Sequence, residues 1–189
     1  ISSMLFWIST FDIGLGNGMR NYLTKAISEK NLVLGRKYIS TTLSLLSLIA
    51  ITIGFFLLIP LFTINFNKFF NTFAISNVDL RNALFVALAF TLLNFVTKNI
   101  GLIFVAMQKY AINDLLSVLG NLLSLAIIFI LTKTTSPNLL YVIFTYTATQ
   151  CFVYLFASIP LFTKYKELRP SLNYFDWSLS RQIVGKGLG

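Results

Sequence analysis

A single lysine lies deep inside a long apolar stretch, which makes it the strongest candidate for chemistry in this chain. Lys98 belongs to an apolar stretch that runs from about residue 82 to residue 107, so it lies nine positions before the end of that stretch. At about 1.5 Å per residue, its Cα lies about 13 Å from that end of a helix, close to the middle of a lipid bilayer. An ammonium there costs about 2.5 to 3.5 kcal/mol unless it is solvated. The side chain therefore either reaches back toward the membrane surface or faces a hydrated interior, where it would attract an anion.

Polar residues at helical spacing favour the hydrated interior. Thr91 and Asn94 precede Lys98 on one helical face, and Asp114 is a candidate partner for Lys98 from another helix. Two later apolar stretches carry similar stripes, which contain Asn113, Ser117, Gly120, Asn121 and Ser124 in the first and Thr145, Thr149 and Gln150 in the second. In lipid such faces turn inward, where they form hydrogen bonds between helices or line water. Hydrogen bonding suits Asn121 better, whereas Lys98 beside Asn94 favours a cavity.

The segment FDIGLGNGMRN, residues 11–21, interrupts the apolar character near the start of the chain. Gly14 and Gly18 are four residues apart, so on one helix they would share a face and let another backbone approach closely. Asp12 and Arg20 belong to a second face at the same spacing. The segment is therefore either a helix end with packing glycines or a place where Asp12 and Arg20 line a polar cavity. The residues that follow show the pattern of an amphipathic helix at the membrane interface.

The composition points to lipid as the solvent of this chain. Of its 189 residues, 56% are hydrophobic and 11% are charged, and the net charge is +9. Histidine is absent and cysteine occurs once, so the sequence lacks the commonest acid-base catalyst and a disulfide or metal cluster. The six acidic residues are scattered, which argues against an enzyme. We expect no catalytic residue, metal or cofactor. Since the basic residues lie between apolar runs rather than on one stripe, we also expect no nucleic acid partner.

Four apolar stretches are long enough to cross a bilayer, which takes roughly 20 helical residues. They cover residues 38–64, 82–107, 115–132 and 139–162. Residues 1–17 look like the end of a preceding span, residues 163–183 like a cytoplasmic linker, and residues 184–189 like the start of a further helix. The predicted fold is an all-α polytopic membrane protein, a transmembrane helix bundle of which about five helices are seen.

Lysine and arginine assign the two sides of the membrane, because loops rich in these residues stay in the cytoplasm. Eleven basic residues fall between residues 20 and 37, at Lys109, and between residues 164 and 186, all on one predicted side. The loops of the opposite side hold only Lys68, Arg81 and Lys133. The basic side is therefore expected in the cytoplasm, and the positive charge is first of all a signal of topology.

The run FDIGLGNGMRNYLTKAISEKN, followed by a long apolar helix, resembles the polysaccharide-export proteins of the O-antigen flippase type. These belong to the multidrug/oligosaccharidyl-lipid/polysaccharide exporter (MOP) superfamily, in which the pattern acid-x-G-L-G-N-G-x-R-N closes the second transmembrane helix. The matching residues are Asp12, Gly14, Leu15, Gly16, Asn17, Gly18, Arg20 and Asn21. Residues 106–109 and 184–189 look similar more loosely. The resemblance implies a partial MOP/MATE-like N-terminal bundle that contains helices two to six and the beginning of helix seven.

This resemblance implies a transporter that flips a lipid-linked oligosaccharide, an isoprenoid pyrophosphate sugar, across the cytoplasmic membrane of a bacterium or archaeon by alternating access. The candidate cavity residues are Lys98, Arg20, Asp12, Asn94, Asn121 and Gln150. The two basic residues would attract the anionic head group, and Asp12 is the candidate proton carrier. The implied partners are the lipid-linked oligosaccharide, membrane lipids and the polysaccharide polymerase machinery.

Three other functions stay open. Another branch of the same superfamily would export drugs, which are amphipathic cations, or a peptidoglycan-precursor lipid. A drug exporter would favour an acidic cavity, whereas the visible candidate residues are mainly basic. A membrane glycan ligase or polymerase would need a catalytic acid, a histidine or a carboxylate cluster. If the protein were a purely structural membrane scaffold, the energetic cost of placing the Lys98 ammonium within the membrane would have no functional reason.

Overall fold

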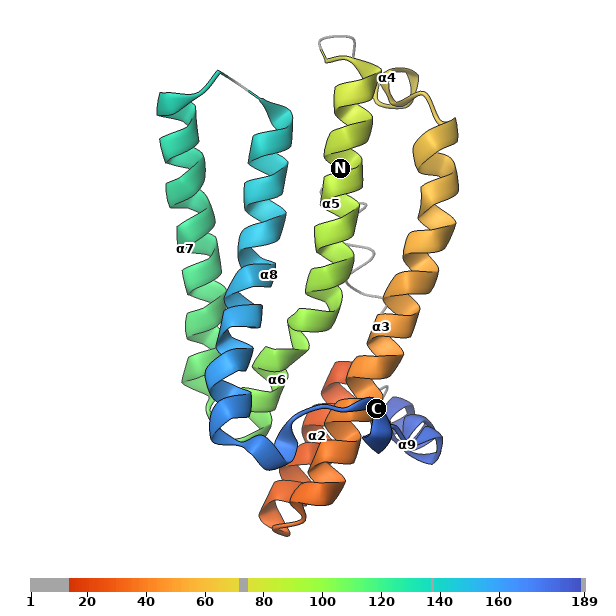
Figure 1. Cartoon of the computed structure of the whole chain (residues 1–189), viewed down its shortest axis with the longest axis vertical. Coiled ribbons are helices and arrows are strands. Elements are labelled where there is room, and N and C mark those ends of the chain that lie inside the picture. Colours follow the sequence, from red (N-terminus) through yellow and green to blue (C-terminus); the bar gives the residue numbers. More distant parts are fainter. Residues whose placement is uncertain (1–13, 72–74, 137, 188–189) are drawn as a thin grey trace.

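The computed structural model describes residues 14–71, 75–136 and 138–187, and within these ranges the chain folds into helices with no strand (Figure 1). The longer helices are α2 (Leu15–Ser28), α3 (Leu32–Thr63), α5 (Asn77–Thr97), α6 (Asn99–Ala106), α7 (Tyr110–Thr134), α8 (Leu139–Lys164) and α9 (Trp177–Gly187). The short elements are α4 (Phe66–Phe69) and the 3-10 helices η1 (Lys166–Leu168) and η2 (Leu172–Tyr174). The predicted all-α fold is confirmed.

Four helical stretches in the described residues are long and apolar enough to cross a membrane, namely α3, α5 together with α6, α7 and α8. Each coincides with one predicted span, but α3 begins six residues before the predicted start at residue 38. Its first turns contain Arg36 and Lys37. A search for an uninterrupted apolar run starts only after these two charged residues, so it places the start of the span too late. The chain is therefore a membrane protein whose first full span has a basic, amphipathic beginning.

The four spans lie side by side in one row, in the order α7, α8, α5 and α3 (Figure 1). Within the row α8 packs against both α7 and α5, and α5 packs against α3. The most apolar windows of α3, α7 and α8 are only 17%, 11% and 22% buried by the described residues, whereas that of α5 and α6 is 44% buried. The α5–α6 stretch is thus the central and best enclosed span, so it can hold polar side chains away from lipid.

Polar side chains at the helix starts satisfy backbone N–H groups that have no partner within the helix. The side chain of Asn31 accepts a hydrogen bond of 3.0 Å from the Leu34 N–H at the start of α3. The Ser76 hydroxyl accepts one of 3.1 Å from the Asp79 N–H at the start of α5. These caps explain why two of the spans begin abruptly after a polar turn.

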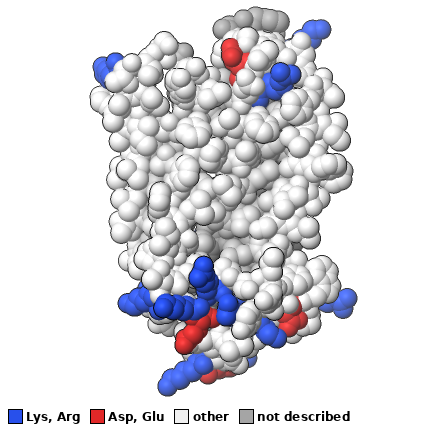
Figure 2. All heavy atoms as spheres, in the orientation of Figure 1, with Lys and Arg blue, Asp and Glu red and all other residues white. Residues whose placement is uncertain are grey.

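Charged side chains gather at the two ends of the row. Figure 2 shows Lys and Arg concentrated at the end where α2 and α9 lie, with few at the end of α4, and the broad band between them uncharged on this face. The dense end includes residues of α2, the beginning of α3 and the segment after α8, among them Lys25, Arg36 and Lys164. This separation of charge is the one that a helical bundle crossing a membrane needs.

A helix begins within the glycine-rich segment. Gly14 has a φ of 72°, in the left-handed region that favours glycine, and α2 starts at the next residue. Gly14 is thus the cap of α2, and of the predicted pair Gly14 and Gly18 only Gly18 lies within the helix, so the prediction that the two glycines form one packing face of a helix is wrong. Gly18 instead allows α9 to approach, because a Cβ there would overlap the carbonyl oxygen of Ile183 and lie 2.9 Å from its carbon. Residues 1–13, including Asp12, lie outside the described residues.

Helix α2 has the amphipathic character that the sequence predicts. Met19, Leu23 and Ala26 are buried, whereas Lys25 and Glu29 are exposed. The buried face packs against α3, α6 and α9. Helix α2 therefore lies beneath the row of spans, at its basic end, as part of a small platform with α9 (Figure 1).

Hydrogen bonds and an ion pair hold the segment after α8 against α3. The Arg36 guanidinium donates a hydrogen bond of 2.7 Å to the Arg169 carbonyl, and the Asp176 N–H donates one of 3.0 Å to the Thr41 hydroxyl. The Lys37 ammonium lies 3.2 Å from the Asp176 carboxylate. A hydrogen bond from the Ser178 hydroxyl, and then the one from Lys37, lower the pKa of Asp176. Helix α9 accordingly begins at Trp177, seven residues before the predicted start of a further helix.

The contact between α2 and α9 gives a testable prediction with an internal control. Gly18→Ala should destabilise the protein by about 1–3 kcal/mol, because the added methyl group forces the backbone of α9 to move. Gly185→Ala, in α9 itself, meets nothing within 4 Å and should leave stability unchanged or raise it by up to about 1 kcal/mol. Thermal unfolding of both variants in the same detergent measures the difference. Equal midpoints would show that α9 does not pack against Gly18.

Candidate functional site

Lys98 occupies an interruption in the central span. Helix α5 ends at Thr97 and α6 begins at Asn99, and the chain changes direction between them (Figure 1). The Lys98 N–H still donates to the Asn94 carbonyl at 2.9 Å, but the Gly101 N–H donates to the Lys98 carbonyl, only three residues back, at 3.0 Å. The sequence predicted one continuous helix here. The break places Lys98 where two helix ends meet.

The side chain of Asn99 bonds to the backbone at this interruption. Its Nδ2 donates to the Phe95 carbonyl at 2.9 Å and to the Val96 carbonyl at 3.3 Å. In a continuous helix these two carbonyls would accept from the N–H groups of Asn99 and Ile100. A side chain inserted into the backbone ladder is a recognised cause of helix kinks. Sequence reasoning missed Asn99, although an asparagine next to a lysine inside an apolar stretch is a signal that could have found it.

Residues close to Lys98 in the sequence contact the two neighbouring spans. On one side Phe95 is in a buried cluster with Leu46 of α3. On the other side the Thr97 hydroxyl donates to the Cys151 sulfur of α8 at 3.8 Å. The outward face of α5 presents apolar side chains such as Leu93, which is 45% exposed. Lys98 itself is half-buried, and its Nζ lies 5.5 Å from the centre of the Phe95 ring.

Asn94 accompanies Lys98 one helical turn away, as the spacing predicts. It is half-buried, and its Oδ1 is shielded from solvent without a hydrogen-bond partner. Two further buried side-chain oxygens in the described residues share this condition, Thr42 Oγ1 in α3 and Asn99 Oδ1 in α6. A buried polar atom that makes no hydrogen bond costs about 1–3 kcal/mol. Such atoms are expected mainly where a protein binds water, an ion or a substrate.

Arg20 belongs to α2, which packs against α6. Its guanidinium donates to the Asn21 side chain at 3.3 and 3.4 Å, and the side chain is half-buried. One turn along α2, the Thr24 hydroxyl lies 3.3 Å from the carbonyl of Ala106, where α6 ends. This contact sets the part of α2 that follows Arg20 against the end of α6. The other predicted cavity residue of this segment, Asp12, is outside the described residues.

Asn121 and Gln150 form a hydrogen-bonded pair between α7 and α8. Gln150 Nε2 donates to Asn121 Oδ1 at 2.7 Å. Gly120 makes room for this pair, because a Cβ at that position would lie 2.5 Å from Gln150 Oε1. The geometry fits the interpretation of Asn121 as a residue that joins helices. Both amides are turned toward each other at this seam, whereas Lys98 and Asn94 belong to the central span.

Asp114 and Asn113 stand at the start of α7, near the middle of α6. The Asn113 side chain donates to Asp114 Oδ1 at 3.2 Å, and its own amide oxygen lies against the Cα of Gly101. A side chain at position 101 would overlap that oxygen and approach Tyr154 of α8 to 3.1 Å. Gly101 therefore permits α6, α7 and α8 to meet closely just below the interruption.

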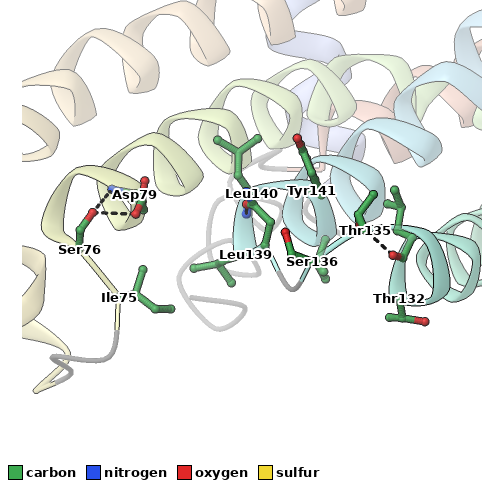
Figure 3. Close-up of a pocket in the computed structure, with 12 residues that line it drawn as sticks. Ile75, Ser76, Asp79, Thr132, Thr135, Ser136, Leu139, Leu140 and Tyr141 are labelled. Carbon is green, nitrogen blue, oxygen red and sulfur yellow. Dashed lines mark hydrogen bonds between the residues drawn. The ribbon is translucent and has the colours of Figure 1, made fainter.

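A cavity of about 650 Å³ lies at the far end of the row, between the start of α5, the end of α7 and the start of α8 (Figure 3). Its lining includes Asp79, Thr135 and Tyr141, and Asp79 accepts a hydrogen bond of 2.7 Å from the Ser76 hydroxyl. Asp79 precedes Lys98 by nineteen residues, about 28 Å along the helix. The cavity is therefore separate from the interruption, and no sequence pattern indicated it.

In comparisons with known proteins, no family model, no curated protein and no solved structure matches the chain. Among the described residues, no group of three or more histidine, cysteine, aspartate or glutamate side chains is placed to hold a metal ion. What the fold and the site define is a class, a polytopic α-helical membrane protein with an interrupted central span that carries a lysine.

The pair at the α7–α8 seam can be tested by a double-mutant cycle. Asn121→Ala and Gln150→Ala should each destabilise the protein, and the double variant should lose less than the sum. We expect a coupling energy of about 0.6 kcal/mol, the average for hydrogen bonds between helices in lipid. Reversible unfolding in detergent measures all four proteins. A coupling energy of zero would show that the two amides do not interact in the membrane.

Proposed function

We propose that this protein is a membrane transporter that flips a lipid-linked oligosaccharide across the cytoplasmic membrane by alternating access. The observation that carries the proposal is the position of Lys98 at the interruption between α5 and α6, in the central and best enclosed span. Ionisable residues within membrane spans are rare and usually mark a transport pathway. The resemblance of residues 11–21 to flippases of the O-antigen type supports the class of cargo.

The chemistry of the interruption suits a pyrophosphate head group. Helix α6 begins at Asn99, and the first N–H groups of a helix favour anions. Transporters commonly place such half-helix ends at their substrate sites near the middle of the bilayer. Lys98 adds a full positive charge at the same place, and Arg20 adds another in α2, the helix that packs against α6. The lipid tail would stay in contact with the apolar surfaces of the row.

The interruption also supports a moving part. At the α5–α6 joint, side-chain hydrogen bonds from Asn99 to the carbonyls of Phe95 and Val96 accompany the backbone bonds that end α5. Such bonds can be exchanged without unfolding either half of the helix. Alternating access would then tilt α6, together with the platform of α2 and α9, against the upper row.

A peptidoglycan-precursor lipid is the second candidate cargo, because it carries the same isoprenoid pyrophosphate and would be attracted by the same lysine. Export of cationic drugs has less support, since the charged group at the interruption is itself a cation. A glycan ligase or polymerase would need a catalytic group that the described residues do not gather around Lys98.

The proposal is tested by surface polysaccharide export in cells that depend on this gene. Lys98→Ala should lower export about tenfold or more, because a charge-assisted contact worth about 1.5–3 kcal/mol is lost. Lys98→Arg should keep part of the activity. Lys133→Ala, which removes an exposed lysine at the other end of the row, is the matched control. Normal export by Lys98→Ala, with the protein present in the membrane at normal level, would contradict the proposal.

A further inference from the structure

Two lysines meet one tyrosine where α7 begins and α8 ends. The Lys109 ammonium donates a hydrogen bond of 2.9 Å to the Tyr165 hydroxyl and lies 4.9 Å from the centre of the Tyr165 ring. The Lys164 ammonium lies 5.8 Å from the same ring centre. Lys109 immediately precedes α7, and Lys164 is the last residue of α8. The fold therefore brings two positive charges from different segments to one aromatic side chain, and we call these three residues the basic cluster.

No acidic side chain balances the charge of the basic cluster within the described residues. Neither Lys109 nor Lys164 belongs to an ion pair there. Glu167, the acid closest to Tyr165 in the sequence, lines a hollow beside the start of α3. Asp114, the acid closest to Lys109, accepts a hydrogen bond from the side chain of the residue before it. Because two ammonium groups near one ring repel each other, an anion between them would be stabilised.

The Tyr165 phenol reports the same positive potential. The hydrogen bond from Lys109 is the main cause that lowers the pKa of Tyr165, and the charges of Lys109 and Lys164 lower it further. A lowered phenol pKa means that negative charge is favoured at this point. The basic cluster is thus suited to an anionic group.

The basic cluster lies at the charged end of the row, directly below two apolar surfaces (Figure 1). Helices α7 and α8 pack against each other, but their most apolar windows are largely unburied. Exposed apolar side chains continue close to the cluster, with Leu115 on α7 and Ile159 on α8. An aromatic residue beside basic residues at the end of apolar helices is typical of the membrane interface. Positive charge and lipid-facing surface therefore meet at one place.

We propose that the basic cluster binds the phosphate head group of an anionic phospholipid, whose acyl chains lie against the exposed faces of α7 and α8. An ammonium has three N–H groups, and Lys109 uses one of them on Tyr165, which leaves others for phosphate oxygens. Tyr165 accepts this bond, so its own O–H can donate to the phosphate. The flexible stem of Lys164 lets its ammonium reach the same group. Basic groups between membrane helices on the cytoplasmic side bind acidic head groups in other membrane proteins.

This lipid site is separate from the proposed cargo site. Helix α6, about 12 Å long, lies between Lys98 and Lys109. The phospholipid belongs to the surrounding membrane and stays bound, so the site is independent of the proposed transport function. Because Lys109 is in the connection from α6 to α7, the bound head group would hold this connection at the membrane surface.

The test uses the purified full-length protein in detergent, titrated with phosphatidylglycerol or with phosphatidylcholine of the same acyl chains. Native mass spectrometry measures the lipid that stays bound, and thermal unfolding gives a second readout. We expect phosphatidylglycerol to bind more tightly. The variant Lys109→Gln/Lys164→Gln should bind phosphatidylglycerol about thirtyfold more weakly, which corresponds to about 1 kcal/mol per lysine, with phosphatidylcholine binding unchanged.

Two further variants separate charge from folding and from position. Lys164→Gln alone should weaken phosphatidylglycerol binding about fivefold. It leaves the hydrogen bond between Lys109 and Tyr165 intact, so a loss cannot come from breaking that contact. The matched control is Lys25→Gln/Lys30→Gln, which removes the same charge from exposed lysines near the end of α2, on the same side of the membrane. This control should bind phosphatidylglycerol as the unaltered protein does.

Three results would overturn the proposal. One is equal binding of the two lipids by the unaltered protein. Another is an equal loss in the control and in Lys109→Gln/Lys164→Gln, which would mean that net charge alone attracts the lipid. The third is displacement of phosphatidylglycerol by an equal concentration of inorganic phosphate, which would mean that the acyl chains contribute nothing. Because no oligosaccharide is used, the lipid site can fail while the proposed transport function stands, and the export assay can fail while the site is retained.

Discussion

In a membrane, every backbone polar group must find its partner inside the protein, because lipid offers none. The central span of this protein breaks its helix at Lys98, and at the break the Asn99 side chain donates to the carbonyls of Phe95 and Val96. A backbone N–H at the end of α5 also bonds to the Val96 carbonyl, so side-chain and backbone hydrogen bonds together satisfy this joint. The lysine, the start of α6 and the unpaired oxygens of Asn94 and Asn99 all lie within two helical turns of this break.

The rest of the structure holds that joint in place. Above it, α5 lies in the centre of a row, enclosed by α3 on one side and α8 on the other. Below it, α6 rests on α2, and α2 is itself held by α3 and α9. The segment after α8 binds the polar side chains that begin α3. The charged end of the molecule is thus a continuous platform, whereas the spans above it contact only their neighbours in the row.

Hydropathy and helical spacing predict much of this fold. They identified the four spans and the amphipathic α2, because burial in a helix follows a regular period. They could not reveal the break at Lys98, because the hydrogen bonds of Asn99 leave no periodic trace. The role of Gly18 was also hidden, since its partner Ile183 is distant in the sequence. The start of α2 after the left-handed Gly14 was likewise not predicted, because the apolar pattern extends across it.

The contact between Gly18 and Ile183 joins residues that are 165 positions apart. At a synthesis rate of about 5–20 residues per second, α2 leaves the ribosome about 8–33 s before α9 can reach it. During that interval the surface around Gly18 is complete but uncovered, at the edge of the membrane. The docking of α9 consequently follows the synthesis of α2, α3 and α6, and a nascent chain arrested before it would leave the Gly18 face of α2 without this cover.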